Sequence, residues 1–383
     1  MSTAPLLVSV VIANHDYEAY VGEAIDSALG LDWPNVEVIV VDDGSTDGSR
    51  AVIERYGARI TTIFQANAGQ CAACNAGFAR SRGDVVIFLD SDDLLDPSLV
   101  RELSAVWRPG VSKVQFQMKT VDAQGRPTGS VFPQFRRVPT PEQIRTWVIT
   151  AGAYPTPPGS GNAYSRAFLE RICPLAGEDR ASDSYYLAAA PYFGDVVTVA
   201  KPLVGYRVHG KNVAAMARLE VKRFAVELVR ARWRFEYART VARAQGIDVP
   251  DDVFDKSLAV LTCRIASLRL APERHPIEGD SRLKVVADVL RAAFVPQGVP
   301  AAGRLAIVSW ALLVAGSPRL MAERCVRWRF VPTSRPKLFL SLLSALGVLS
   351  RSSSHTTTEE NGRMKEWRAR PWRELARRFE GSR

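Results

Sequence analysis

The sequence has few of the residues from which disulfide frameworks and zinc clusters are built. Its 383 residues include five cysteines and four histidines. So few cysteines exclude a small disulfide-stapled fold and are typical of a reducing compartment. Cys71 and Cys74 form a single CxxC with no second cysteine pair and no nearby histidine. We therefore expect them to be a buried helical pair rather than a metal or redox site.

Apolar runs long enough to cross a bilayer are also missing. The two runs that stand out, 305–316 and 338–349, fall short of the roughly 20 residues that a span requires. They are expected to be either core helices or interfacial segments. Residues 1–7 lead directly into a strand and lack the basic and apolar regions of a signal peptide. We therefore expect the front half of the chain to remain in the cytoplasm.

Positive charge is scarce in the front of the chain and abundant in the rear. Residues 1–215 carry a net charge of about −4 and the remainder about +14. A basic region attracts nucleic acid, anionic lipid or phosphorylated substrate, or is simply solvated. No nucleic-acid-binding module is recognisable, so nucleic acid is not an expected partner. The tail 365–379 mixes arginines with Trp367 and Trp372 after a Ser/Thr-rich linker at 350–358, which suits a membrane surface.

Short β-branched runs alternate with helical patterns through the first 90 residues. This alternation predicts an α/β fold with a doubly wound, mostly parallel sheet, in which ligands bind at the carboxyl ends of the strands. The expected strands are 8–12, 36–41, 60–64 and 84–89, and the expected helices are 20–29, 49–56 and 68–81.

The pattern changes further along the chain. A helix at 98–107, a strand at 113–119 and a polar turn at 122–125 precede a proline-rich stretch, 132–160, which we expect to be irregular and to face an acceptor. A further helix follows Asp183, and 219–245 and 253–270 are the longest helical patterns of a mainly α-helical C-terminal region. We therefore expect three parts, namely a ligand-binding domain at 1–215, a helical accessory region at 216–349, and a linker with a basic tail at 350–383.

Acidic clusters follow two of the expected strands. Asp42–Asp47 comes after the second strand and Asp90–Asp93 after the fourth. Either cluster could simply cap the helix that follows it. However, three carboxylates in four residues repel each other unless a cation neutralises them, and a hard divalent ion is held by one or two carboxylates together with phosphate oxygens. Because both clusters end strands of one sheet, we expect them to lie together.

Four motifs in order resemble the family 2 glycosyltransferases. They are Val8–Asn14, Glu37–Asp47, Asn67–Gly69 with Asn75, and Phe88–Asp93, and they cover the N-terminal half almost continuously. The resemblance implies the A-type glycosyltransferase fold, a nucleotide-diphosphate sugar donor and inverting chemistry. The Tyr-Asn that is usual after the first strand is replaced here by His15-Asp16, which leaves the role of His15 open.

Carried over by position, the resemblance assigns site residues. Asp43 would contact the nucleotide base, and Asp92 would be the principal ligand of Mg²⁺ or Mn²⁺, with Asp90 and Asp93 beside it. The remaining substrate-binding residues would be Ala13, Asn14, Asn67, Gly69, Asn75, Ser91, Gly161, Asn162 and Arg207.

A carboxylate must also take the proton of the acceptor hydroxyl. Glu178, Asp179 and Asp183 are the candidates, and Asp183 is favoured because it opens a helix and precedes Tyr206-Arg-Val-His-Gly210 at the family's spacing. In that loop Arg207 would hold the diphosphate, and His209 would be a metal ligand. The Gln-x-x-Arg-Trp signature of processive synthases is absent, so one sugar per encounter is expected.

These observations favour an inverting, metal-dependent transfer to a hydroxyl of a glycan or lipid-linked acceptor, in cell-envelope polysaccharide biosynthesis. The acceptor and a peripheral position on the inner face of the cytoplasmic membrane are inferred from the basic tail and the apolar runs. Two alternatives stay open, namely transfer to polyprenyl phosphate, which needs no base, and a non-catalytic nucleotide-sugar-binding protein.

Overall fold

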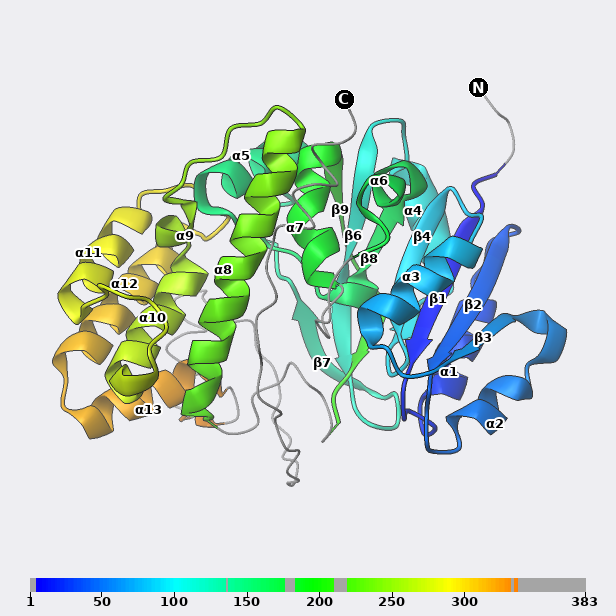
Figure 1. Cartoon of the computed structure of the whole chain (residues 1–383), viewed down its shortest axis with the longest axis horizontal. Coiled ribbons are helices and arrows are strands. Elements are labelled where there is room, and N and C mark those ends of the chain that lie inside the picture. The colour runs from blue at the N-terminus through cyan, green and yellow to red at the C-terminus, as the bar shows by residue number, and fades with distance from the viewer. Residues whose placement is uncertain (1–4, 136, 176–182, 210–218, 332–333, 337–383) are drawn as a thin grey trace. The chain divides into compact units, whose positions relative to one another are not determined.

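A computed structural model describes residues 5–135, 137–175, 183–209, 219–331 and 334–336 (Figure 1). Their contacts divide the chain into two compact units. Within the described residues, the first unit contains 5–142 and 155–209, and the second contains 143–154 and the helices from Val221 onward. The domain boundaries expected near 215 and 349 lie outside the described residues and stay predictions.

The first unit is built on one nine-stranded sheet with the order β3-β2-β1-β4-β8-β6-β9-β5, and β7 pairs with β6. The strands expected near the N-terminus are confirmed, and their apolar runs are buried because helices cover them. The strands are β1 (Val8–Asn14), β2 (Val36–Asp43), β3 (Thr61–Gln65), β4 (Val85–Asp90), β5 (Leu94–Leu95), β6 (Val111–Val121), β7 (Pro127–Phe132), β8 (Asn162–Ser165) and β9 (Asp195–Arg207).

Most strands of this sheet point the same way. β1, β2, β3 and β4 pair in parallel, whereas β8 is antiparallel to both β4 and β6. Because β8 is antiparallel to both of its neighbours, β6 runs in the same direction as β4. β9 is parallel to β6 and therefore runs in that direction too. As a result Asn14, Asp43, Asp90 and Arg207, which end four different strands, stand at one edge of the sheet. The expected doubly wound, mostly parallel α/β sheet is confirmed.

The helices of the first unit follow the sequence pattern closely. Cys71 and Cys74 are both buried on α3, so the expectation of a buried helical pair is confirmed. The proline-rich stretch 132–160 was wrongly expected to be irregular throughout, because it contains a helix, α5, that starts at Pro141, where a proline is tolerated. The helices from α1 to α7 are α1 (Val21–Leu29), α2 (Ser49–Glu54), α3 (Gln70–Arg80), α4 (Leu99–Val106), α5 (Pro141–Ala151), α6 (Arg166–Ile172) and α7 (Asp183–Phe193).

The second unit is helical, as expected, and its core surrounds α10. The helix expected at 253–270 is interrupted, because the backbone of Ser257 is extended. No helix within the described part of the chain combines the length and the apolar character that a bilayer span needs. Its helices are α8 (Val221–Ala244), α9 (Val253–Lys256), α10 (Leu258–Leu270), α11 (Arg282–Ala292), α12 (Ala301–Gly316) and α13 (Arg319–Phe330).

Gly77 sets how closely α3 approaches the sheet. A Cβ atom there would lie 2.3 Å from Val11 Cγ1 and 3.2 Å from Val41 Cγ2. We predict that Gly77→Ala lowers the free energy of unfolding by about 1–3 kcal/mol through overpacking, measured by denaturant titration. Gly22→Ala is the matched control, because a Cβ in that helical position would meet its nearest atoms at 3.5 Å. The control should leave stability unchanged or raise it by up to about 1 kcal/mol, and equal effects of the two variants would contradict the prediction.

Candidate functional site

The loops after β1 and β2 are held together by buried polar side chains. The Asn14 amide donates to Asp42 Oδ1 at 2.9 Å and to Ser45 Oγ at 3.1 Å, and Asn14 is 1% exposed. The Asp16 carboxylate accepts a hydrogen bond from the backbone N–H of Thr46 at 2.6 Å. The backbone of Asp16 itself is left-handed (φ 57°), a conformation that aspartate tolerates. The residues that replace the usual Tyr-Asn therefore take part in fixing the loop.

Asp43 is already engaged by the segment that follows β3. Its carboxylate accepts from the N–H groups of Ala68 and Gly69 at 2.9 and 2.7 Å and from Gln65 Nε2 at 2.7 Å, and it is 4% exposed. A carboxylate has about four acceptor positions, so only one remains. Asp43 fixes this loop, and any base contact is limited to that one position.

Asn67 and Asn75, both expected to bind substrate, lie in different surroundings. Asn67 Nδ2 is exposed and lies 3.0 Å from His15 Nε2, at the tip of the two loops. Gly44 lies against it, since a Cβ there would be 2.7 Å from the Asn67 nitrogen. The Asn75 amide instead donates to the carbonyl of Leu175 at 2.9 Å and accepts from its N–H at 2.8 Å. Asn75 therefore anchors backbone, a role that its sequence motif does not reveal.

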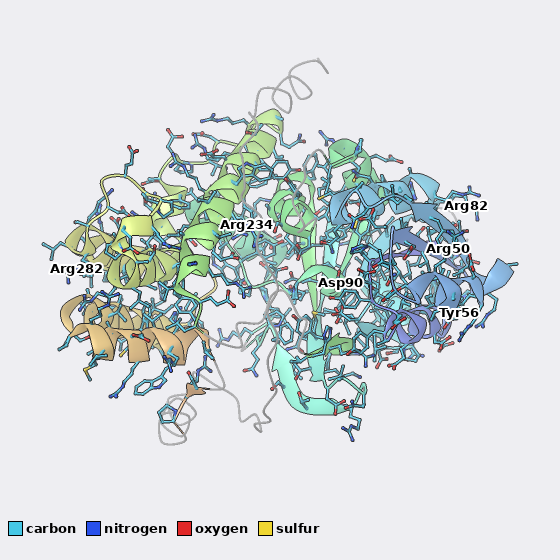
Figure 2. All side chains as sticks on the ribbon, turned by 60° about the horizontal axis from the view of Figure 1, so that its bottom comes forward. Arg50, Tyr56, Arg82, Asp90, Arg234 and Arg282 are labelled. Carbon is cyan, nitrogen blue, oxygen red and sulfur yellow. The ribbon has the colours of Figure 1, made fainter. Side chains whose placement is uncertain are left out.

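The loop after β4, which begins at Asp90 (labelled in Figure 2), carries three carboxylates in four residues, and each of them is buried or half-buried. Burial, reinforced by Asp92 and Asp183, raises the pKa of Asp90 to about 7. Burial, then Asp90 and Asp92, also raise the pKa of Asp93, which is 1% exposed. Ser91 Oγ donates to the carbonyl of Ala13 at 3.2 Å and so ties this loop to β1. The carboxylates of this loop therefore repel one another, while the hydrogen bond of Ser91 fixes the loop to β1.

Arg207 supports the acidic loop from beneath. Its guanidinium is completely buried and donates to the carbonyls of Asp92 and Ala123 at 2.8 and 2.9 Å and to Glu23 Oε2 at 2.6 Å. Its backbone N–H donates to Asp93 Oδ1 at 3.0 Å. All three guanidinium nitrogens bind protein oxygens in this structure, so Arg207 positions the acidic loop, and its expected contact with a diphosphate stays a prediction.

His209 faces Asp92, which like Asp90 is only partly buried. Its Nε2 lies 2.9 Å from Asp92 Oδ2, and the Asp92 side chain is 13% exposed. Tyr20 stacks on the imidazole at 4.8 Å between centroids, and Tyr17 meets it edge-on at 5.9 Å. Sequence reasoning missed both tyrosines, although their spacing of three before α1 places them side by side.

The donor set at Asp92 and His209 fits a divalent cation. Carboxylate oxygen and imidazole nitrogen are both metal ligands, and no group of three such side chains stands together among the residues that the structure describes. Two protein ligands completed by phosphate oxygens and water are what Mg²⁺ and Mn²⁺ accept. A cation here would also offset the charge that raises the pKa of Asp90 and Asp93.

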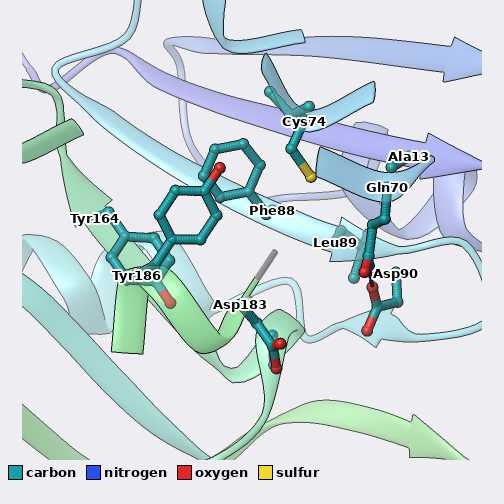
Figure 3. A pocket seen from close by; sticks show the side chains of 11 residues that line it. Ala13, Gln70, Cys74, Phe88, Leu89, Asp90, Tyr164, Asp183 and Tyr186 are labelled. Carbon is teal, nitrogen blue, oxygen red and sulfur yellow. Dashed lines mark hydrogen bonds between the residues drawn. The ribbon is translucent and has the colours of Figure 1, made fainter. Parts of the chain in front are cut away.

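Asp183 and Asp90 face the same pocket from opposite walls (Figure 3). Asp183 opens α7, and its Oδ2 accepts from the N–H of Gly159 at 3.2 Å. Gln70 Nε2 donates to Asp90 Oδ1 at 3.1 Å. The competing carboxylates at 178 and 179 lie outside the described residues. The rest of the lining is Val11, Ala13, Cys74, Phe88, Leu89, Tyr164 and Tyr186.

Gly161 and Asn162 come shortly after Gly159, which lines this pocket, and fix the backbone there. Asn162 is completely buried, donates to the carbonyls of Pro158 and Gly159 at 2.9 and 3.1 Å, and accepts from Lys113 Nζ at 2.9 Å. Gly161 is required by packing, since a Cβ there would lie 2.6 Å from Pro157 Cβ. These bonds give Asn162 a positioning role, and its expected contact with substrate stays a prediction. Sequence reasoning missed Lys113, because a lysine in a strand is usually exposed.

The raised pKa of Asp90 predicts how stability depends on pH without metal. Folding favours the protonated carboxyl, so this stabilisation is present below pH 4 and is lost as the pH rises through about 7. In EDTA, Asp90→Asn should therefore be more stable than the parent by about 1–3 kcal/mol at pH 8 and much closer to it at pH 5. Thermal unfolding at both pH values tests this.

Asp32→Asn is the control for that comparison, because the Asp32 side chain is 73% exposed. It should follow the parent at both pH values. An Asp90→Asn variant that is destabilised at pH 8 would contradict the electrostatic account of the loop.

The Arg207 contacts predict a structural penalty for a smaller cation. Arg207→Lys keeps the charge but loses the fork that reaches three oxygens, so we predict a loss of about 2–4 kcal/mol in the free energy of unfolding. Denaturant titration measures it. Arg82→Lys, on a side chain 78% exposed, should change stability by less than about 0.5 kcal/mol. A similar small effect at 207 would refute the supporting role.

Comparisons with known proteins agree with this geometry. Residues 9–173 match the sequence model described as "Glycosyl transferase family 2". An uncharacterized glycosyltransferase of Nostoc sp. is 34% identical over 213 residues, which is 54% of this chain and 66% of the relative. The putative glycosyltransferase EpsH of Bacillus subtilis is 28% identical over 216 residues, or 54% of this chain and 62% of the relative. The aligned part of the chain thus spans less than two thirds of the length of either relative.

A solved structure shares the fold. The crystal structure of S. aureus TarS 1–349 in complex with UDP-GlcNAc superposes with a TM-score of 0.50 at 17% identity, covering 90% of this chain and 93% of that one. At this identity the likeness concerns the fold alone, and it agrees with the expected A-type glycosyltransferase architecture. The family match over residues 9–173 and the ordered motifs at the carboxyl edge of the sheet make this part of the chain similar to glycosyl transferase family 2.

Proposed function

We propose that this chain transfers a sugar from a nucleotide-diphosphate donor to a hydroxyl of a glycan or lipid-linked acceptor, with inversion and with Mg²⁺ or Mn²⁺ bound. One arrangement carries the proposal. Asp92 and His209 form a two-ligand metal position on the acidic loop, and Asp183 stands across a pocket from Asp90 on the same loop. Carboxylates whose pKa is raised by burial and then by neighbouring carboxylates are typical of functional sites, which supports a catalytic rather than a purely structural role.

The residues divide the chemistry between them. Asp92 and His209 would hold the cation, which when bound offsets the charge that develops on the leaving diphosphate. Asp183 would accept the proton of the acceptor hydroxyl as it attacks the anomeric carbon. The N–H of Gly159 donates to Asp183, which orients the carboxylate toward the pocket. Gln70 and the Ser160 hydroxyl, which lies 3.0 Å from the Asp90 nitrogen, hold the opposite wall in place.

A nucleotide-diphosphate sugar is the donor class that the residues at the ends of β1 and β2 would accommodate. The nucleotide would lie over the ends of β1 and β2, beside Asn67 and the one acceptor position left on Asp43. TarS, which shares the fold, binds UDP-GlcNAc, and a nucleotide-diphosphate sugar is the natural donor class to test first. We further propose a catalytic domain within 1–215, a role in cell-envelope polysaccharide biosynthesis, and a peripheral place on the inner face of the cytoplasmic membrane.

Donor hydrolysis tests the proposal without knowledge of the acceptor. The protein is incubated with a panel of nucleotide-diphosphate sugars and Mn²⁺ or Mg²⁺, and released nucleoside diphosphate is measured. One donor should be hydrolysed slowly and only with metal, and Asp92→Ala should abolish this activity. Asp32→Asn, on an exposed side chain, should leave it unchanged. No hydrolysis and no metal-dependent binding of any donor would favour the non-catalytic alternative.

Asp183 is tested once an acceptor is found. Asp183→Asn should lower kcat about 10²- to 10⁴-fold, as expected for loss of a general base, with little change in KM for the donor. Full activity of this variant with polyprenyl phosphate would instead support the alternative in which the acceptor is already anionic and no base is needed. Inversion itself is read from the anomeric configuration of the product.

A further inference from the structure

The helix α12 is strongly apolar, yet most of it lies at the surface. Of its sixteen residues only Ala311 and Val314 are buried. Leu305 is 67% exposed, and Leu312 and Leu313 are 48% and 53% exposed. Large exposed aliphatic side chains in one helix are costly in water, so they indicate a surface that meets something else.

The neighbouring helix α11 shows the same division. Its exposed apolar residues Leu283 and Leu290 lie seven positions apart on one helix face, and Phe294 follows in the turn just after the helix. Leu283 and Phe294 are 85% and 86% exposed. Val285 and Val289 on the opposite face are buried in the core of the second unit. The helix therefore has two apolar faces, and the core uses only one of them.

These exposed faces adjoin. Arg282 at the start of α11 donates to the carbonyl of Ala315 near the end of α12 at 3.4 Å, and Arg304 near the start of α12 donates to the carbonyl of Ala293 at 2.8 Å. The two helices are therefore antiparallel neighbours, and both pack on α10. The α11–α13 face, as we name it, consists of Leu283, Leu290, Phe294, Leu305, Leu312, Leu313, Leu320 and Met321, the last two 77% and 54% exposed on the first turn of α13.

The charge around this face is one-sided. Residues 282–330 contain eight arginines and lysines but only two acidic residues, Asp288 and Glu323. Asp288 is 6% exposed and is paired with Arg291 at 2.6 Å, so it adds little negative charge to the surface. The basic residues are Arg282, which is labelled in Figure 2, with Lys284, Arg291, Arg304, Arg319, Arg324, Arg327 and Arg329.

We propose that the α11–α13 face docks on the surface of an anionic lipid bilayer, with its leucines and Phe294 in the acyl boundary and its arginines and lysines at the headgroups. Lys284, Arg291 and Arg327 are paired with Asp280, Asp288 and Glu323. Arg282, Arg319 and Arg324 are exposed beside the aliphatic side chains. Long aliphatic side chains together with an excess of basic ones are what an interfacial helix presents to such a surface. A second copy of this chain would instead bring a like-charged face against it. The proposal does not depend on the chemistry at Asp92, and it differs from the membrane contact expected of the tail, which lies outside the described residues.

Vesicle flotation with the full chain tests the proposal. Vesicles of phosphatidylcholine with phosphatidylglycerol should bind the protein, pure phosphatidylcholine vesicles at least tenfold less, and 0.5 M NaCl should weaken the binding. The fourfold variant combines Leu283→Gln, Phe294→Gln, Leu305→Gln and Leu320→Gln in one chain. It should bind the anionic vesicles at least tenfold less tightly than the parent. Each of these side chains is at least 67% exposed, so unchanged circular dichroism and unfolding temperature are expected.

Two control variants locate the effect. Val226→Gln with Val229→Gln changes exposed apolar residues on α8 of the same unit, 37% and 45% exposed, and should keep parental binding. Trp367→Ser with Trp372→Ser changes the tail and should retain most of it. If the fourfold variant loses stability, Arg282→Gln with Lys284→Gln, at exposed positions, should still weaken binding to anionic vesicles severalfold.

Several outcomes would overturn the proposal. One is that the parent does not bind anionic vesicles, and another is that the fourfold variant binds them as tightly as the parent. A third is that binding is lost in the tail variant alone. The last is that light scattering without lipid shows a dimer for the parent and a monomer for the fourfold variant, so that the face is an interface between copies. Donor hydrolysis in lipid-free buffer should be equal in the parent and the fourfold variant. A failure of the catalytic proposal is therefore visible separately from a failure of the lipid proposal.

Discussion

Repulsion between carboxylates at the end of β4 is the constraint around which the site is arranged. Asp90 and Asp93 are buried beside Asp92 and Asp183, and their pKa values are raised by burial and by one another. Such a cluster is unfavourable in a folded protein unless protons or a cation neutralise it. The surrounding chain therefore has to hold the carboxylates in place until a ligand with compensating charge arrives. The proposed metal position at Asp92 and His209 would meet that requirement.

The means of holding them is backbone anchoring by buried polar side chains. Arg207 carries the loop from below, Asp43 fixes the segment at 65–69, and Asn162 fixes the wall at 158–159. Each of these residues has the chemical type of a ligand-binding group, yet each directs most or all of its hydrogen bonds to the protein. Preorganisation of this kind keeps the few open groups, Asp92, His209 and Asp183, at fixed positions relative to one another.

The sequence was sufficient for the sheet, for the two acidic clusters at its edge and for the pairing of Asp92 with His209 at one position. Periodic apolar runs and the rule for carboxyl ends of parallel strands determine the sheet and the place of the acidic clusters. The joint position of Asp92 and His209 came from the family resemblance. It was insufficient for the roles of Arg207 and Asn162, because a residue type does not show whether its hydrogen bonds go to a ligand or to a carbonyl far along the chain. The helix α5 was not predicted, because the prolines of the stretch 132–160 indicated irregular structure. The second apolar face of α11 was not predicted, because apolar periodicity predicts a buried side without saying how many sides are buried. For α12 the sequence left a core helix and an interfacial segment both open.

The central claim is that a divalent cation binds between Asp92 and His209 at the edge of the sheet. Anomalous diffraction from crystals grown with Mn²⁺ and a nucleoside diphosphate measures this directly. The account predicts one manganese peak at bonding distance from a carboxylate oxygen of Asp92 and from His209 Nε2, with phosphate oxygens completing the shell and with Asp183 not bound to the metal. A peak at Asp42 and Asp43 instead, or a diphosphate bound without any manganese, would contradict it.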